Sequence, residues 1–495
     1  MDLPLTPSID PNHVLSGNFA PVAELPPTAC EVVEGSLPAC LDGAYIRNGP
    51  NPQFIPRGPY HLLDGDGMLH SIRISGGEAY FCSRYVKTYK FITEGNEGYA
   101  FFPSPFSSFN GVLASAARFC LAVARGIFGY FDPIVNGFGT ANTSLAFFGG
   151  SVYALCESDL PYEIEVTWDG EIVTLGRRHF GGDSSLRMTA HPKIDSDTGE
   201  VFAFRCNMFS PYLTFFRIDS AGRKGPDLPV SSFKKTPCVH DFALTKRFII
   251  FQDGQIEMEP AEIGRGRTPL VCDRGKVPRI GILPRHADAQ VLWIEAPGLN
   301  MLHVINAWEE YSGDRIVIVA PNFLSVEDGF HNTNLIHSVF EIITLDIKEK
   351  KLVSRHVLRS NNMEFGVINQ AYAGEKNKYL YAAVIAEMPK AAGMVKLDLS
   401  IATAGGGDCT VASREYGSGC YGGESYFVAR EAENPAAEED DGYLVTYVHD
   451  ENSMESWFWV MDAKSPTLEI IARVKLPGRV PYGFHGLFVP EDDLK

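Results

Sequence analysis

The sequence predicts a large all-β protein built from many short antiparallel strands. Short runs rich in β-branched and aromatic residues recur at intervals of about ten to twenty residues. Turns rich in Gly, Asp, Asn and Pro separate these runs, and little helical periodicity lies between them. Because a parallel βαβ fold needs a helix between successive strands, this texture favours an antiparallel architecture.

The predicted strands are spread over the whole chain. The clearest runs are EAYFCSRYV (78–86), SVYALCES (151–158), EVFAFRC (200–206), YLTFFRID (212–219), RFIIFQD (247–253), RIVIVAP (315–321), FEIITLDI (340–347), YLYAAVI (379–385), GMVKLDL (393–399), GYLVTYVHD (442–450), SWFWVMD (456–462) and LEIIARVKL (468–476). The last three resemble the strands of one β-propeller blade. No sequence repeat accompanies them, so periodicity gives no blade count.

Composition narrows the class of protein. With 495 residues and 45% hydrophobic content, the chain is long enough for a large buried core. Length alone suggests two to four domains, although a propeller of this length can also be a single unit. The net charge of −18 argues against binding to a phosphate backbone, so we do not expect nucleic acid as a partner. We interpret the acidic run EAENPAAEEDDG (431–442) as a solvated loop.

The cysteines and the N-terminal residues indicate the cell compartment in which the protein folds. None of the ten cysteines forms a CxxC pair, and residues such as Cys82, Cys156 and Cys206 lie in apolar, strand-like runs. This pattern predicts buried thiols in a reducing compartment and gives no zinc-ribbon or iron–sulfur spacing. The first residues are Pro-rich and partly acidic, without the character of a secretory signal or transit peptide. No apolar run reaches the roughly 18 residues of a spanning helix.

Segment 101–131 does not show the pattern of short strands seen in the rest of the chain. It predicts a helix that starts near Asn110 and has one apolar face. That face consists of Leu113, Ala116, Ala117, Cys120, Leu121, Ala124, Ile127 and Phe128, while Arg118 and Arg125 lie on another face. One interpretation is a helix that caps the core. The other is a monotopic patch that dips into a lipid surface, where the arginines meet headgroups.

Four of the thirteen histidines have unusual surroundings. They are His191 in MTAHPKID, His240 in CVHDFAL, His303 in MLHVINAWEE and His485 in PYGFHGLFV. Each lies among apolar or small residues at the edge of a predicted strand, and no local HxH or HxxxH motif joins them. A single histidine of this kind is usually structural. A radially repeating fold such as a propeller would bring all four to one axis.

Four neutral imidazoles would leave the full charge on a divalent metal and positions open for oxygen. Imidazole suits iron, zinc and copper alike, so ligand type does not select the metal. Ligating histidines usually donate their second N–H to a carboxylate or carbonyl. Glu157, Glu364 and Glu424 lie in apolar surroundings and are candidates for that role, although each on its own also fits a strand-end salt bridge.

DGDGM (64–68) superficially resembles a calcium loop. It lacks the further acidic ligands and the terminal Glu of such a loop, so we interpret it as a turn between strands.

Several segments form a recognisable set: GAYIRNGPNPQF…PYHLLDGDGMLHSIRI (43–74), ANTSLAFFGG (141–150), ESDLPYEI, TAHPKID, HDFALT, GKVPRIGILPR, INAWEE, YGGESYFVAR, DGYLVTYVHD, MDAKSP and VPYGFHGLF. Taken together, these segments resemble the carotenoid cleavage dioxygenase family, most closely its plant class-4 branch of plastid enzymes. They occur in the family's order over nearly the whole chain.

The resemblance implies a seven-bladed β-propeller with a helical cap over an axial metal site, formed by residues 1–495 as a single domain. It implies Fe(II) as the cofactor. The implied ligands are His191, His240, His303 and His485, and the implied outer carboxylates are Glu157, Glu364 and Glu424. Thr143 matches a position near the open face of the iron, where it would shape oxygen or substrate access. Segment 101–131 falls where the family's membrane-contacting patch is expected.

The implied activity is oxidative cleavage of a C=C bond of a carotenoid or apocarotenoid, with O₂ supplying the oxygen of two carbonyl products. We expect the polyene to thread an apolar tunnel, and we expect no separate acid–base residue. A carotenoid or retinoid isomerase on the same scaffold, a non-catalytic carotenoid-binding propeller and, more remotely, a zinc hydrolase are the alternatives. The resemblance also implies a plastid location at a membrane or plastoglobule surface.

Overall fold

The protein is mostly β-structure with few and short helices. The structure, a computed structural model, describes residues 5–56, 58–102, 106, 117, 120–121, 123–126, 132–182, 187–259, 261–262, 268–286, 290–327, 332–402 and 407–494. Every strand pair is antiparallel. The prediction of an antiparallel, strand-rich architecture is confirmed.

Five sheets contain four or five strands each. One sheet has the order β1 (Leu25–Ala29), β5 (Glu78–Tyr85), β4 (Gly67–Ser75), β3 (Gly43–Pro50) and β33 (Gly486–Pro490). The next two are β6 (Ser144–Phe148), β7 (Ser151–Leu155), β8 (Tyr162–Val166) and β9 (Ile172–Arg177), then β10 (Lys193–Ile194), β11 (Val201–Cys206), β12 (Leu213–Ile218) and β13 (Leu228–Val230). The remaining two are β14 (Phe242–Leu244), β15 (Phe248–Asp253), β18 (Arg279–Pro284) and β19 (Leu292–Glu295), then β20 (Asn306–Glu310), β21 (Arg315–Phe323), β22 (Ser338–Asp346) and β23 (Lys351–Arg359).

A larger sheet of ten strands closes the series. Its path is β2 (Glu31–Gly35), β32 (Ile470–Lys475), β31 (Glu455–Asp462), β30 (Gly442–Asp450), β28 (Cys420–Gly422), β26 (Lys390–Asp398), β25 (Tyr379–Glu387) and β24 (Met363–Val367). Off this path, β27 (Thr410–Glu415) pairs with β26 and β29 (Tyr426–Ala429) pairs with β30. A separate hairpin consists of β16 (Ile256–Met258) and β17 (Leu270–Cys272).

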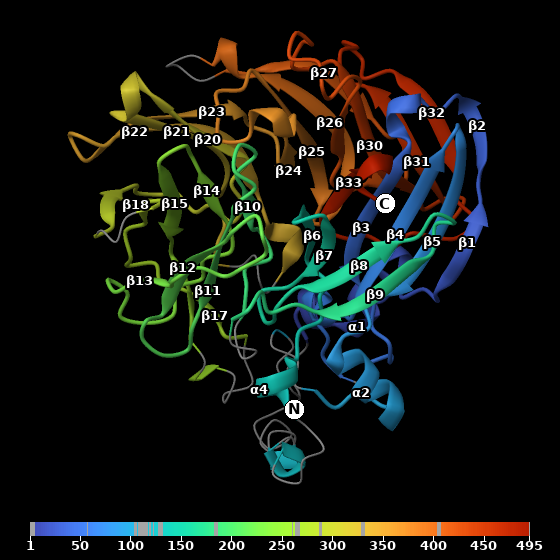
Figure 1. Cartoon of the computed structure of the whole chain (residues 1–495), viewed down its shortest axis with the longest axis horizontal. Helices are drawn as coiled ribbons and strands as arrows, with labels where there is room; N and C mark the ends of the chain where they lie inside the picture. Colours follow the sequence, from blue (N-terminus) through green and yellow to red (C-terminus); the bar gives the residue numbers. More distant parts are fainter. Residues whose placement is uncertain are drawn as a thin grey trace.

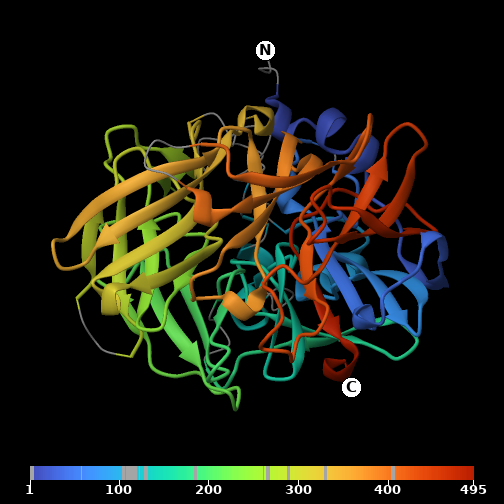
Figure 2. The ribbon, with the colours of Figure 1, turned by 90° about the horizontal axis from the view of Figure 1, so that it is seen from above.

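The sheets stand side by side around a common centre. In Figure 1 the strands nearest that centre are β6, β10, β14, β20, β24 and β33, each of which ends a sheet in the hydrogen-bonded order. Seen from above, helix α1 (Pro11–Val14) and the C-terminal turn lie on opposite faces of the molecule (Figure 2). The first and last parts of the chain meet in one sheet, because β33 pairs with β3.

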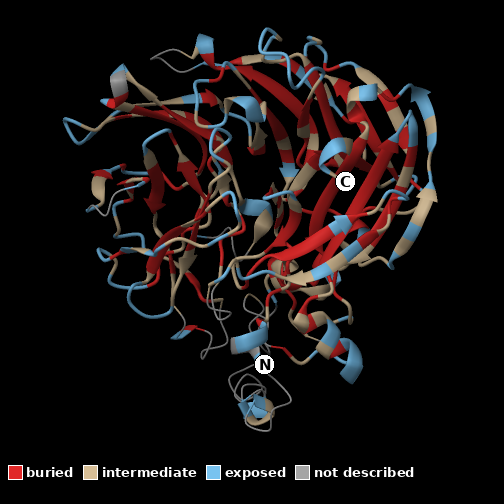
Figure 3. Ribbon diagram, in the orientation of Figure 1, coloured by how far each residue is buried: buried red, intermediate tan, exposed pale blue. Residues whose placement is uncertain are grey.

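The hydrophobic core is divided between neighbouring sheets. One cluster packs β4 and β5 against β30, β31 and β32, and another packs β15 and β18 against β21 and β22. Figure 3 shows buried residues along the strands and exposed residues mainly at the loops and helices. The end strands that face the centre are therefore held by packing on both sides.

The helices lie together at one side of the ring. They include α2 (Tyr89–Glu97) and α4 (Pro133–Asn136), which both lie below the sheets in Figure 1. Most of the predicted helix in 101–131, including its expected start at Asn110 and residues Leu113, Ala116, Arg118, Ile127 and Phe128, lies outside the described residues. Of the described ones, Ala117, Cys120, Leu121 and residues 123–126 are helical.

The predicted strands agree with the structure to within a few residues. Two other expectations need correction. The acidic run 431–442 is exposed over its first half, but Glu439 accepts backbone N–H groups of Lys378 and Tyr379, and Asp440 pairs with Lys396. All ten cysteines are free, yet Cys156 and Cys206 are only partly buried. Both corrections arise at strand ends, where the local sequence does not reveal which neighbour covers a side chain.

Candidate metal centre

The four predicted histidines occupy equivalent places in four sheets. His191 stands just before β10, His240 before β14, His303 before β20 and His485 before β33. Each of these strands is the innermost strand of its sheet, so the loops before them point to the same centre (Figure 1). Strand order thus brings together residues that are far apart in the sequence.

The imidazole rings meet closely. Nε2 of His240 lies 2.9 Å from Nε2 of His191 and 3.2 Å from Nε2 of His303. One nitrogen from each of the four rings falls within 4.8 Å of the others. Two imidazole nitrogens bound side by side to one ion at about 2.1 Å are themselves roughly 3 Å apart. The spacing therefore fits a single shared metal ion.

Carboxylates hold the outer nitrogen of three of these rings. Nδ1 of His303 donates to Glu364 and Nδ1 of His485 donates to Glu424, each at 2.9 Å. Nδ1 of His240 lies 2.6 Å from Glu157. Among the described residues, no carboxylate contacts His191, whose backbone N–H donates instead to the Thr189 hydroxyl.

This arrangement fixes the protons of the histidines. A carboxylate at Nδ1 keeps the ring proton there, so Nε2 carries a lone pair. Lone pairs of neighbouring rings then face one another at hydrogen-bond distance with no proton between them. Burial lowers the pKa of His191 well below its usual value, and the three other rings lower it further. Converging lone pairs, one of them on a ring that resists protonation, are suited to a metal cation.

Glu364 is the most enclosed of the three carboxylates, with 1% of its surface exposed. Burial alone would raise its pKa, but the neighbouring His303 lowers it on balance, so Glu364 is an ionised acceptor. Its second oxygen accepts the N–H of Phe365, whose φ of +54° is rare for a bulky residue. The Phe365 ring lies 5.9 Å from that of His485. This irregular position in β24, where the register with β25 shifts, therefore lies beside both His303 and His485.

Thr143 lies directly before β6, the innermost strand of its sheet, which is the position equivalent to those of the histidines. Its hydroxyl donates to Asn142, and its backbone N–H donates to Leu155 O in β7. The strand order thus places Thr143 on the central side of its sheet. A role near the open face of an iron stays a prediction.

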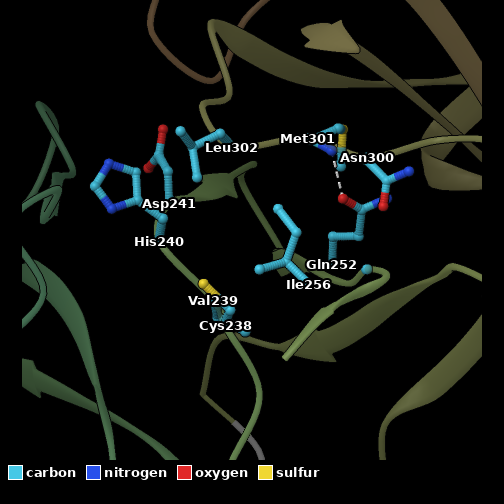
Figure 4. A pocket seen from close by; sticks show the side chains of 10 residues that line it. Cys238, Val239, His240, Asp241, Gln252, Ile256, Asn300, Met301 and Leu302 are labelled. Carbon is cyan, nitrogen blue, oxygen red and sulfur yellow. Dashed lines mark hydrogen bonds between the residues drawn. The ribbon is translucent and has the colours of Figure 1, made fainter. Parts of the chain in front are cut away.

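Two cavities adjoin the histidines. A cleft of about 680 Å³ runs between the inner strands and is lined by His191, His303 and His485 together with charged residues such as Lys193 and Arg285. A smaller pocket of about 20 Å³ lies beside His240 and is lined by Cys238, Gln252 and Met301, among others (Figure 4). That volume holds little more than one water molecule. Apolar side chains such as Phe147, Ile305 and Phe365 also line the cleft. A long apolar tunnel for a polyene stays a prediction.

Comparison with known proteins identifies the family. Residues 19–490 match the family model described as retinal pigment epithelial membrane protein. The chain is 54% identical to the probable chloroplastic carotenoid cleavage dioxygenase 4 of Arabidopsis thaliana, over all of this chain and 83% of that protein. The chain belongs to the carotenoid cleavage dioxygenase family. It is also 50% identical to a chloroplastic 9-cis-epoxycarotenoid dioxygenase of Oryza sativa subsp. japonica, over 99% of this chain and 78% of that protein.

Solved structures agree on the fold of this dioxygenase family member. Cobalt-substituted Synechocystis apocarotenoid oxygenase superposes with a TM-score of 0.80 at 24% identity, covering 98% of this chain and 99% of that one. Pseudomonas brassicacearum lignostilbene dioxygenase superposes with a TM-score of 0.81 at 22% identity, covering 99% and 100%. The resemblance to the class-4 branch is confirmed, and the chloroplastic names of the plant relatives agree with the expected plastid location.

Sequence reasoning overlooked three residues at this centre. Asp241, Lys193 and Phe365 each stand within two residues of a predicted ligand or carboxylate. Asp241 and Lys193 tie neighbouring strands together, while the Phe365 ring lies beside that of His485. In the sequence, only its position directly after His240 pointed to a role for Asp241. Its meaning depends on partners that are far away in the sequence.

Proposed function

We propose that the chain is a non-heme iron(II) dioxygenase that cleaves a C=C bond of a carotenoid or apocarotenoid and yields two carbonyl products. The observation that carries this proposal is the convergence of four imidazoles, three of them held by carboxylates. Membership of the carotenoid cleavage dioxygenase family supports iron and the polyene substrate class.

His191, His240, His303 and His485 would hold the iron, which when bound supplies the oxygen chemistry that side chains lack. The chain's own residues orient the ligands and keep their protons at Nδ1. Four imidazoles leave room for a further position on the side that Thr143 is proposed to flank. Glu157, Glu364 and Glu424 then act on the reaction only through the histidines that they position.

We also propose that residues 1–495 form one seven-bladed propeller. Dividing the ten-stranded sheet into β24–β27 and β29–β32 with β2, with β28 as the link between β26 and β30, gives seven groups of four or five strands. Six inner strands already surround the histidine cluster, and β29 would supply the seventh. Helices α2 and α4 and the helical residues of 117–126 would form the cap.

A membrane or plastoglobule surface is the proposed site of action, because the substrate is insoluble in water. The described part of 101–131 exposes Leu121 and Val123, and Val135 of α4 and Ile92 of α2 are exposed on neighbouring helices. No helix in the described part of the chain is long and apolar enough to cross a membrane. Docking from one side fits both observations.

Incubation of the iron-loaded protein with a panel of carotenoids under ¹⁸O₂ tests the proposal. We expect aldehyde or ketone products that carry the label, detected by mass spectrometry before exchange with water. His303→Ala should lose both iron and product. Conversion without label would favour the isomerase, and carotenoid binding without conversion in an iron-loaded protein would favour a binding module. Stoichiometric zinc without iron after anaerobic reconstitution would favour a hydrolase.

A further inference from the structure

Asp241 makes an unusual set of contacts for a residue next to a ligand histidine. It follows His240 directly and is 7% exposed. Figure 4 shows its carboxylate beside the His240 ring, between that ring and Leu302. Asp241 lines both the cleft between the inner strands and the smaller pocket beside His240, so it stands between these two cavities.

Three donors from three sheets meet on this carboxylate. Oδ2 accepts the backbone N–H of Val304 at 2.8 Å. Oδ1 accepts the backbone N–H of Phe242 at 2.7 Å and lies 2.8 Å from Nζ of Lys193. The Lys193 side chain is itself largely covered, with 27% exposed. One carboxylate therefore joins the inner ends of β10, β14 and the loop before β20.

Each donor is a close neighbour of a ligand histidine. Lys193 is two residues after His191, Phe242 is two after His240, and Val304 directly follows His303. These are the three histidines whose Nε2 atoms lie 2.9 and 3.2 Å from one ring to the next. His485 is held differently, through Glu424, which accepts both its ring N–H and the backbone N–H of Gly486.

We propose that Asp241 is a positioning residue that sets the mutual spacing of His191, His240 and His303. The inference rests on the proposed function, because it concerns how these rings come to share one iron. Charge-assisted bonds to a buried carboxylate are short and strong, and water does not readily replace them there. Glu157, Glu364 and Glu424 orient individual rings, whereas Asp241 fixes the loops that carry three of them.

The chemistry of asparagine makes the proposal testable. In Asp241→Asn the side chain would keep nearly the same shape, but only one of its two polar ends would accept hydrogen bonds. If the amide oxygen faces Phe242 and Lys193, the NH₂ group meets the N–H of Val304. If the amide is turned around, the NH₂ group meets the N–H of Phe242 and the ammonium of Lys193. In either orientation two hydrogen-bond donors face each other, and one bond of the side chain is lost. The loop that carries one of the three histidines is then no longer tied to the other two.

The experiment measures the iron dissociation constant of the wild type and of Asp241→Asn by competition with a ferrous chelator. We expect Asp241→Asn to weaken iron binding about 10- to 100-fold, the range known for outer partners of metal ligands. Its Mössbauer quadrupole splitting should change, because the ligand arrangement shifts. Lys193→Met removes one link and leaves both amide bonds, so it should give a smaller loss and remain folded.

Asp66→Asn is the matched control. Asp66 is also buried and accepts from one lysine, Lys90 at 2.6 Å, and one backbone amide, that of Gln53 at 3.0 Å, with no ligand histidine beside either partner. It should lower thermal stability but leave iron affinity and the Mössbauer spectrum unchanged. Equal iron affinity in the wild type, Asp241→Asn and Lys193→Met would overturn the inference, as would an equal loss in Asp66→Asn. A wild type that binds no iron would instead contradict the proposed function.

Discussion

At the scale of single residues, the candidate centre depends on carboxylates of unequal burial. Glu364 is almost fully enclosed and accepts from both His303 and a backbone amide. The side chain of Glu157 is 36% exposed beside His240. The Glu157 oxygen that faces His240 is buried, but water reaches the rest of that side chain, whereas Glu364 is enclosed as a whole and also holds a backbone amide. The two carboxylates are therefore not equally important to the histidines that they orient.

We predict that Glu364→Gln weakens iron binding about 10- to 100-fold and that Glu157→Gln weakens it less. Glu341→Gln is the control, because Glu341 is another buried glutamate, paired with Arg355 at 2.6 Å and remote in sequence from the histidines. Its iron affinity should equal that of the wild type. Titration with a ferrous chelator measures all three, and a larger loss in Glu157→Gln would contradict the ranking.

At the scale of elements, α2 is anchored by a buried ionic cluster. Nζ of Lys90 lies 2.6 Å from Asp66 and 2.9 Å from Glu94. Burial alone would lower the pKa of Lys90, but the two carboxylates raise it on balance. Glu94 also accepts the backbone N–H groups of Phe101 and Phe102, where segment 101–131 begins. The DGDGM run is not a turn by itself: it leads from the last residue of η4 (Leu62–Asp64) into β4, at the end of the longer connection from β3. Its Asp66 fixes α2.

Lys90→Met should lower the free energy of unfolding by about 3–5 kcal/mol, because it leaves two buried carboxylates without their cation. Lys87→Met is its control. Lys87 pairs with Glu24 at 2.7 Å at the surface, where such a pair contributes about 1 kcal/mol or less. Chemical denaturation followed by fluorescence compares the two, and similar losses would show that the cluster does not anchor the helix.

The exposed helical residues make the membrane proposal testable. Leu121→Asp combined with Val123→Asp should weaken binding to galactolipid vesicles about tenfold or more, because two apolar side chains no longer enter the lipid. We expect Arg125 to contribute less to lipid binding than the sequence suggests, since its guanidinium packs on the Phe101 ring, 4.1 Å from the ring centroid. Vesicle flotation measures the effect. Val353→Asp, at a similarly exposed site on β23, should bind like the wild type, and equal losses would contradict the patch.

At the scale of the whole molecule, buried histidines outside the metal centre predict a loss of stability in acid. Burial lowers the pKa of His70 to about 3, with Arg47 and Arg479 adding to the effect. The unfolded chain protonates this ring near its usual pKa of about 6.5, whereas the folded chain does not. Between these values the unfolded state binds more protons, so stability falls as the pH falls.

His70→Asn should therefore reduce the pH dependence of unfolding. Between pH 6 and pH 5 we expect its free energy of unfolding to fall by about 1.2 kcal/mol less than that of the wild type. Chemical denaturation at a series of pH values gives both slopes. His13→Asn is the control, because His13 lies near the surface with 38% of its side chain exposed. Parallel slopes for His70→Asn and the wild type would contradict a buried neutral His70.

The sequence predicts the strands and the four histidines because both are local signals that the fold then brings together. Runs such as 442–450 and 456–462 carry their own β propensity, and each histidine stands at a strand edge that faces the centre. The contacts of Asp241 and the left-handed backbone of Phe365 are different. They depend on which sheets become neighbours, and a single sequence does not state that. The predicted start of the helix at Asn110 lies outside the described residues.

The central claim is that four histidines hold one iron. X-ray absorption spectroscopy of the iron-loaded protein tests it most directly, together with the iron content per chain. We expect one iron per chain with four imidazole nitrogens, and a loss of iron or of one imidazole in His303→Ala. An iron bound by fewer than four imidazoles in the wild type, or a spectrum unchanged by His303→Ala, would contradict the account.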